Sequence, residues 1–288
     1  MVKLYKEVNK KRDMKTILRD LSATGLVKKA IQENWENYHY CLGRSPSVEL
    51  SLGRYLSWFI TNMPDHFMNL IVCTQLPPDG PVELIERALE HFRSLHIQKA
   101  TWLVRESVPG AEIKKCLLSH GLTLNESFGA EMAADLSSIP EAVPIPAGLK
   151  IVRVEDRETL QQWIHAASIG FHVPAEYEDV WYEFFAEAVF EQPFWSYLAL
   201  LDGQPVGTSQ LFLSAGVAGI YNVTCVPEAR GKGIGAAITL APLLDARAIG
   251  YRIAILQASE MGARVYRRLG FQDFGQLSVY LWKNNAQP

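Results

Sequence analysis

The chain of 288 residues is long enough for one or two globular domains, and a hydrophobic content of 48% with 20% charged residues is ordinary for that class. A formal net charge of −3 gives no overall attraction to nucleic acid or to an anionic membrane, so neither is expected as a partner. Four cysteines without a CxxC pair predict reduced thiols in a cytoplasmic protein, rather than a disulfide framework or a metal site.

Two segments raise the question of targeting or membrane insertion. Residues 1–15 contain six basic and two acidic side chains but no apolar run, which argues against a secretory signal peptide. Residues 204–227 carry no charge and are long enough to span a membrane. Their glycines and polar side chains instead predict a two-stranded hairpin with its turn near Ala215 and Gly216.

The first part of the chain alternates between helical and strand patterns. In order, we predict a helix within 15–40, strands over 48–60 and 67–73, a helix over 78–96, a strand over 100–104, a helix over 111–121 and two strands within 122–135. The composition then changes, because Pro140, Pro144 and Pro146 lie within residues 137–148. We interpret this stretch as a semi-rigid linker between domains 1–136 and 149–288.

The second part opens with a strand and two helices. In order, we predict a strand over 150–154, helices ending near Ser168 and Phe184, strands over 195–201, 206–213 and 217–226, a helix over 234–249, a strand over 252–257, a helix over 259–271 and closing strands over 271–282.

Residues 220–235, with the sequence IYNVTCVPEARGKGIG, predict an anion site. A buried strand ends at Pro227, which has no N–H to donate to a sheet. A glycine-rich turn follows, and the next helix begins near Ile234. Glycines allow close backbone approach, and the free N–H groups and dipole of a helix start attract negative charge. With Arg230 and Lys232 adding full charges, the turn suits a pyrophosphate.

The pattern Arg230-x-x-Gly233-x-Gly235 after this strand resembles the acetyl-CoA loop of the GNAT superfamily of N-acetyltransferases. The later segment 259–271, SEMGARVYRRLGF, is similar to a second GNAT block and follows at the expected distance. The resemblance implies a mixed α/β sheet fold and acetyl-CoA as cosubstrate, with no metal. It further implies transfer of the acetyl group to an amine of a small molecule or peptide by direct attack.

The two halves look like copies of one fold. Gly121 and Gly270 each follow a predicted helix, and Pro78 and Pro227 each end a predicted strand; both pairs are 149 residues apart. At that offset the loop residues of the second half are replaced in the first by Pro81, Leu84 and Glu86, and Tyr266 is replaced by Leu117. We therefore predict tandem GNAT-like domains with a degenerate N-terminal copy and one CoA per chain.

The resemblance also assigns roles to individual residues. Backbone groups at Thr224, Cys225 and Val226 would bind pantetheine and the developing oxyanion, and Tyr266 would protonate the leaving sulfur. The pyrophosphate loop would comprise Arg230, Gly231, Lys232, Gly233, Ile234 and Gly235. Ser259 stands where many relatives carry an asparagine. Arg267 and Arg268 would contact a phosphate or else lie on a solvated helix face.

Several alternatives stay open. The general base is unassigned, with His172, Glu176 and Glu178 as candidates. The aromatic residues between Trp163 and Trp195, with Asp179, Glu183, Glu187 and Glu191 alongside, form either an acceptor pocket or a core with a solvated acidic face. A further alternative for the mechanism is that Cys225 acts as a nucleophile that carries the acyl group. The chain could also be a CoA-binding regulatory module, or a dinucleotide-binding oxidoreductase because Gly231-x-Gly233-x-x-Ala236 matches a relaxed GxGxx(G/A) pattern.

Overall fold

The computed structural model describes residues 17–61, 63, 68–73, 75–106, 108, 110–186, 189–190 and 193–284. The basic segment 1–15 lies outside these residues, as do Glu187 and Glu191. No helix in the described ranges combines the length and the apolar character needed to cross a bilayer. The uncharged stretch 204–227 instead forms the predicted hairpin, whose turn residues Ala215 and Gly216 both have positive φ.

The chain folds into two compact units that do not follow chain order. One unit combines residues Met1–Cys41 with Glu131–Phe274, and the other combines Leu42–Ala130 with Gly275–Pro288. Helix α2 (Thr24–Leu42) therefore belongs almost entirely with the C-terminal half, and most of strand β12 (Gln272–Lys283) belongs with the N-terminal half. The segment 137–148 is predicted to separate two copies of one fold. Compact units are defined by contacts and not by repeats, so the boundary stays a prediction.

The unit that contains residues 42–130 has a mixed sheet in the order β1-β2-β3-β4-β12, with β5 beside β12. Its elements are β1 (Val48–Leu52), β2 (Leu56–Thr61), β3 (Asn69–Cys73), α3 (Val82–Ser94), β4 (Lys99–Arg105), α4 (Gly110–Ser119) and β5 (Thr123–Asn125). The single strand predicted over 48–60 is wrong: the chain turns at Gly53, whose N–H donates to Ser57 Oγ, and β1 pairs antiparallel with β2. Apolar side chains of α3 and α4 lie in one buried cluster with Trp102 of β4.

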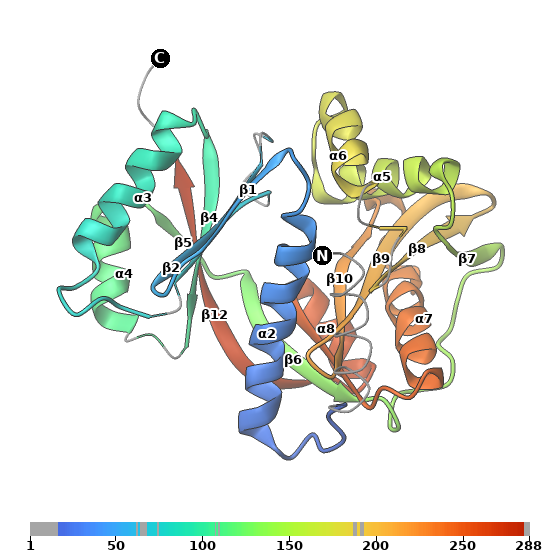
Figure 1. The fold of residues 1–288 in the computed structure, drawn as a ribbon. Coiled ribbons are helices and arrows are strands. Elements are labelled where there is room, and N and C mark those ends of the chain that lie inside the picture. The colour runs from blue at the N-terminus through green and yellow to red at the C-terminus, as the bar shows by residue number, and fades with distance from the viewer. Residues whose placement is uncertain are drawn as a thin grey trace. The chain divides into compact units, whose positions relative to one another are not determined.

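The unit that contains residues 131–274 has a sheet in the order β6-β11-β10-β9-β8-β7 (Figure 1). Its elements are β6 (Phe128–Asp135), β7 (Leu149–Arg153), α5 (Arg157–Phe171), α6 (Glu178–Ala186), β8 (Phe194–Leu201), β9 (Gln204–Ser214), β10 (Val217–Cys225), α7 (Ile234–Ala248), β11 (Ile253–Ser259) and α8 (Glu260–Arg268). Helices α5 and α7 both pack on β9 and β10. The predicted order of elements is thus confirmed, with shifts of a few residues at their ends.

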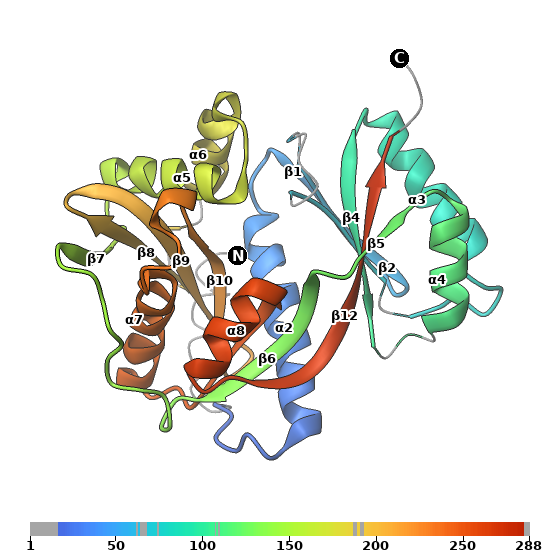
Figure 2. The same ribbon diagram turned by 180° about the vertical axis from the view of Figure 1, so that it is seen from behind.

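The two halves repeat one pattern of pairing. In each, two antiparallel pairings precede a parallel one, as β1-β2-β3-β4 and as β8-β9-β10-β11. The last strand of each half lies in the sheet formed by the other half. Strand β6, at the end of the N-terminal half, neighbours β11. Strand β12, at the end of the C-terminal half, pairs with β4 (Figure 2). An ion pair between Asp135 and Arg252 at 3.1 Å fixes the end of β6 beside the start of β11.

Helix α2 covers part of the sheet of the unit that contains residues 131–274. Its Val27 and Ile31 pack against Val217 of β10 and Ile253 and Ile255 of β11.

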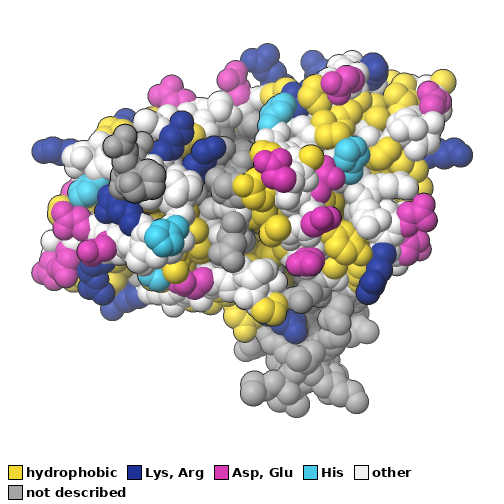
Figure 3. Space-filling model, turned by 90° about the horizontal axis from the view of Figure 1, so that it is seen from above, with side chains coloured by type: hydrophobic (Ala, Val, Ile, Leu, Met, Phe, Trp, Pro, Cys, Tyr) yellow, Lys and Arg dark blue, Asp and Glu magenta, His cyan; other side chains and the backbone are white. Residues whose placement is uncertain are grey.

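Charged side chains of both signs lie scattered over the face drawn in Figure 3, with no broad field of positive charge. That distribution agrees with the small net charge of the chain.

Candidate functional site

The glycine turn between β10 and α7 has the conformation that an anion loop requires. Gly231 has φ 76° and Gly233 has φ 84°, values that favour glycine, and Gly233 is the N-cap of α7. Gly231, Lys232 and Gly233 are all exposed. A Cβ added at Gly231 would meet nothing within 4 Å, so the backbone is open to a ligand at that residue, whereas a Cβ added at Gly233 would lie 2.8 Å from the carbonyl oxygen of Pro144. The free amides of the first turn of α7 add a positive end of the helix dipole at this point.

Arg230 is held by the protein rather than left free for a phosphate. Its Nε donates to the carbonyl oxygen of Cys225 at 3.2 Å, and its Nη2 donates to the carbonyl oxygen of Gly170 at 3.1 Å. The guanidinium therefore ties the turn to the end of β10 and to the last turn of α5. The positive charge of Arg230 still contributes to the electrostatic potential around the turn. Its N–H donors hold the backbone carbonyls of Cys225 and Gly170 in place.

Strands β10 and β11 separate beyond their first residues. Parallel pairing among the described residues joins Ala218 to Ala254 and Gly219 to Ile255, although both strands continue well past these positions. A bulge in β10 lies between Tyr221 and Thr224 in its pairing with β9. The opening predicted between the motif strand and the following strand is therefore present.

Of the three predicted backbone contacts, Cys225 is the one whose amide faces this opening. Val226 cannot supply a free N–H, because that group donates to the carbonyl oxygen of Val206 at 3.0 Å. Neighbouring residues of a strand direct their amides to opposite edges. The amides of Thr224 and Val226 thus face β9, and the N–H of Cys225 faces the side of β11.

Tyr266 lies buried on α8, with 8% of its surface exposed. Burial raises its pKa, and the neighbouring Cys225 thiol raises it further. Burial also raises the pKa of Cys225 to about 11, although Arg230 partly opposes the shift. Both groups therefore keep their protons at neutral pH, and the protonated Cys225 thiol is a poor nucleophile, which argues against the acyl-carrying alternative.

The comparisons with known proteins agree with this geometry. Residues 193–273 match the family model described as an acetyltransferase (GNAT) domain, a range that includes the loop, the opening and Tyr266. This range is a GNAT domain. Comparison with curated proteins finds no match.

Solved structures extend the likeness of fold beyond that range. A GCN5-related N-acetyltransferase from Kribbella flavida has a TM-score of 0.64 at 18% identity, covering 88% of this chain and 96% of that one. One from Sphaerobacter thermophilus has 0.57 at 18%, covering 81% and 82%. A tandem GNAT protein from the clavulanic acid biosynthesis pathway has 0.54 at 18%, covering 94% and 98%. GNAT-fold structures, one of them a tandem protein, thus cover most of the chain.

Two other predicted ligand side chains of the GNAT domain are engaged within the protein. Ser259 is the N-cap of α8, and its Oγ accepts a hydrogen bond from the N–H of Gly262 at 3.1 Å. Arg267 forms two hydrogen bonds with the carboxylate of Asp273, at 2.9 and 3.0 Å. These contacts favour the solvated-face interpretation of Arg267.

The candidate bases belong to the segment around α5 and α6. His172 is exposed and is the C-cap of α5 in a left-handed conformation. Glu176 is exposed. Glu178 accepts a short hydrogen bond from Ser168 and pairs with His165 at 3.1 Å, so it joins α6 to α5. The general base stays unassigned.

Four aromatic side chains of this region form a core. Trp163, Trp181, Phe184 and Phe185 are buried, with ring centroids 4.9 to 6.2 Å apart in the contacts that Phe185 makes. These four therefore follow the core interpretation rather than the pocket one.

The sequence patterns missed a polar cluster on β9 and β10. Tyr38 of α2 stacks on Tyr221 at 3.9 Å, donates to Gln210 Oε1 and accepts from Asn222 Nδ2. Asn222 has φ 50° at the bulge, and its carbonyl oxygen accepts from Thr208 Oγ1. No local signal ties residue 38 to residue 222.

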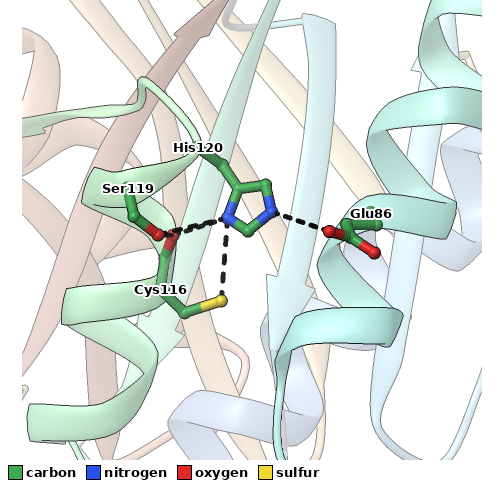
Figure 4. A network of polar contacts seen from close by, with 4 residues as sticks. All are labelled: Glu86, Cys116, Ser119 and His120. Atoms are coloured by element: carbon green, nitrogen blue, oxygen red, sulfur yellow. Dashed lines mark hydrogen bonds and ion pairs between the residues drawn. The ribbon is translucent and has the colours of Figure 1, made fainter.

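A second polar cluster, on α3 and α4, lacks the geometry of a cysteine active site (Figure 4). His120 Nδ1 lies 2.8 Å from the carbonyl oxygen of Cys116 and 3.7 Å from its Sγ, so the ring nitrogen donates to the backbone instead of accepting from the thiol. Burial raises the pKa of Cys116, as do Glu86 and Glu112. The contact of His120 with Glu86 at 3.5 Å joins the two helices. Within the described ranges, no group of His, Cys, Asp and Glu could hold a metal ion.

Proposed function

We propose that the protein transfers an acetyl group from acetyl-CoA to the amine of a small molecule or peptide, with one active site per chain in the GNAT domain. The observation that carries the proposal is the exposed turn Gly231–Gly233, whose positive φ values present backbone N–H groups at the start of α7 beside the opening of β10 and β11. These features suit the pyrophosphate and the pantetheine arm of CoA.

The chemistry is a direct transfer. The amine nitrogen forms a bond to the acyl carbon, the carbon–sulfur bond breaks, and the sulfur leaves as a thiolate that takes a proton. The N–H of Cys225 would stabilise the oxyanion, a contribution that is typically about 3–4 kcal/mol in other enzymes. Tyr266 would supply the proton to sulfur, while the amine loses its own proton to a base or to water.

At the corresponding helix start, within the described residues 75–106, the N-terminal half has no equivalent loop. Helix α3 has Pro81 as its N-cap, with φ −85°, and Leu84 and Glu86 occupy the positions of the later glycines. Proline lacks an N–H group and Glu86 would repel a phosphate, so we expect a single CoA site.

Release of free thiol from acetyl-CoA, measured over a panel of amines and peptides, tests the proposal. We expect amine-dependent thiol release, one CoA site per chain by calorimetry, and a fall in kcat of roughly 10²-fold for Tyr266→Phe. Binding of acetyl-CoA without transfer to any amine would favour the regulatory module. An oxidoreductase would bind NADH in place of acetyl-CoA, but the antiparallel pairing of β9 with β10 departs from a doubly wound sheet.

A further inference from the structure

Asn222 lies in β10 at the level where this strand has left β11. Among the described residues, Gly219 is the last one of β10 that pairs with β11, and the bulge between Tyr221 and Thr224 follows soon after it. Asn222 belongs to this bulge and has φ 50°, a conformation that few residues other than glycine adopt. Such strained residues persist where their neighbours fix them, and they are common at functional sites.

The bulge lies at the junction of two helices on one face of the sheet. Tyr221 pairs with Gln210 and Thr224 pairs with Thr208, and these two residues of β9 share a face because they are two positions apart. Helix α2 covers the face at Tyr221, through the ring stacking and a hydrogen bond. Helix α5 covers it at Thr224, whose side chain lies against Gly170. The bulge is therefore bordered by α2 on one side and by α5 on the other.

The Asn222 carboxamide is held by its nitrogen and keeps its oxygen for a ligand. Its Nδ2 donates to the Tyr38 hydroxyl at 2.9 Å and to Gln210 Oε1 at 3.2 Å, which uses both N–H groups. Gln210 is fixed in turn, because its Nε2 donates to Ser196 Oγ at 2.9 Å. The Asn222 side chain is half-buried, and its Oδ1 retains accessible surface but has no hydrogen-bond partner among the described residues. A ligand N–H can therefore reach this oxygen.

The groups that hold this amide are uncharged. Burial raises the pKa of Tyr38, so its hydroxyl keeps its proton, and Gln210 carries no charge. A neutral amine is the nucleophile that direct transfer requires. An amide oxygen can accept a hydrogen bond from such an amine without taking its proton, so Asn222 can orient the nitrogen but cannot act as the general base.

We infer that Asn222 Oδ1 accepts a hydrogen bond from the attacking nitrogen of a primary amine, while Tyr38 of α2 and Gln210 hold the amide in place. The inference rests on the proposed function, because the amine must meet the thioester at the opening of β10 and β11. One N–H of the primary amine would bind Oδ1, the other would lose its proton to a base or water, and the lone pair would attack the acyl carbon. A secondary amine has a single N–H and cannot do both.

Thiol release from acetyl-CoA with phenethylamine and with N-methylphenethylamine tests the inference. The most reactive primary amine of the panel and its N-methyl derivative form a second pair. The variant is Asn222→Gly, because glycine adopts φ 50° without strain. We expect its kcat/KM to fall roughly fivefold to tenfold with each primary amine, as for one hydrogen bond, and to stay unchanged with each N-methyl amine. A variant that only gained room would do the opposite, with faster transfer to the N-methyl amines, and that result would overturn the inference.

The controls separate this inference from the proposed function. Asn37→Ala removes another half-buried amide of the same face, one that donates to Ser214 Oγ, and should leave both rates unchanged. Acetyl-CoA affinity of Asn222→Gly should stay within twofold of wild type in calorimetry. Equal losses with the two amines of a pair, or no loss with either, would overturn the role of Asn222 and leave the proposed function standing. Absence of thiol release from wild type with every amine of the panel would overturn both.

Discussion

At Gly170, helix α5 lies close against β10. A Cβ added there would lie 2.5 Å from Cγ2 and 3.0 Å from Cβ of Thr224, with Oγ1 closer still. Ordinary contacts between carbon atoms are about 3.5–4.0 Å, so Gly170→Ala is short by roughly 1 Å. Rotation of the threonine side chain cannot relieve the contact with its Cβ. The backbone of α5 or β10 must move.

The size of the effect follows from two opposing contributions. Overpacking of this kind costs about 1–3 kcal/mol, and the better helix propensity of alanine returns up to about 1 kcal/mol. We expect Gly170→Ala to lower the free energy of unfolding by about 1–2 kcal/mol. Because Arg230 donates to the carbonyl oxygen of Gly170, the glycine turn before α7 should also shift. Under the proposed function, this shift weakens acetyl-CoA binding several-fold.

Chemical denaturation and calorimetry measure the two effects separately. The double variant Gly170→Ala with Thr224→Ala removes the two closest atoms and should recover at least half of the lost stability. Gly25→Ala in α2 is the matched control, since nothing lies within 4 Å of its added Cβ, and it should be neutral or slightly stabilising. The reasoning fails if Gly170→Ala behaves like this control, or if the double variant is no more stable than the single one.

Three further predictions follow from the site. Gly233→Ala forces a non-glycine residue to φ 84° and puts a Cβ 2.8 Å from the carbonyl oxygen of Pro144, so acetyl-CoA affinity should fall more than tenfold. The control Gly231→Ala has the backbone strain without the close contact, and its loss of affinity should be smaller. Equal losses of affinity for the two variants in calorimetry would contradict a role for Pro144. Since the pKa of Cys225 rises from 9.0 to about 11 on folding, the folded state binds more protons between these values, and urea unfolding should show stability falling more steeply from pH 9 to 11 in wild type than in Cys225→Ala. Tyr38→Phe removes one hydrogen bond from the buried Gln210 amide and one from the half-buried Asn222 amide, which keep their own bond at 3.2 Å. It should cost about 1 kcal/mol in the same unfolding assay, a result that a neutral variant would refute.

The conformation of the glycine turn before α7 was predictable because every part of it is local. The strand, the turn glycines and the helix start lie within residues 220–235, and backbone preferences act over that range. The hairpin at Ala215–Gly216 and the alternation of elements were predictable for the same reason. Their end points shifted by a few residues because capping and packing set the last turn of a helix or the last pair of a strand.

The uses of individual side chains were less predictable. Arg230, Ser259 and Arg267 have the residue types of ligands, yet each is engaged within the protein. A polar side chain near a site can bind a ligand or hold the backbone, and composition does not distinguish the two. Only the positions of its neighbours decide which donor remains for a substrate.

The amino-acid sequence by itself determined the helices and strands, the glycine turn before α7 and the repeat of one fold. Apolar periodicity and the positions of glycine and proline fix backbone conformation over a few residues, so these features can be read from the sequence. Tertiary packing decided that α2 docks on the sheet of the GNAT domain, that β6 lies beside β11, and that β12 pairs with β4. Those pairings join residues more than a hundred positions apart. These pairings are stabilised by complementary packing surfaces and by hydrogen bonds between strand edges, which cannot be read from a local sequence pattern.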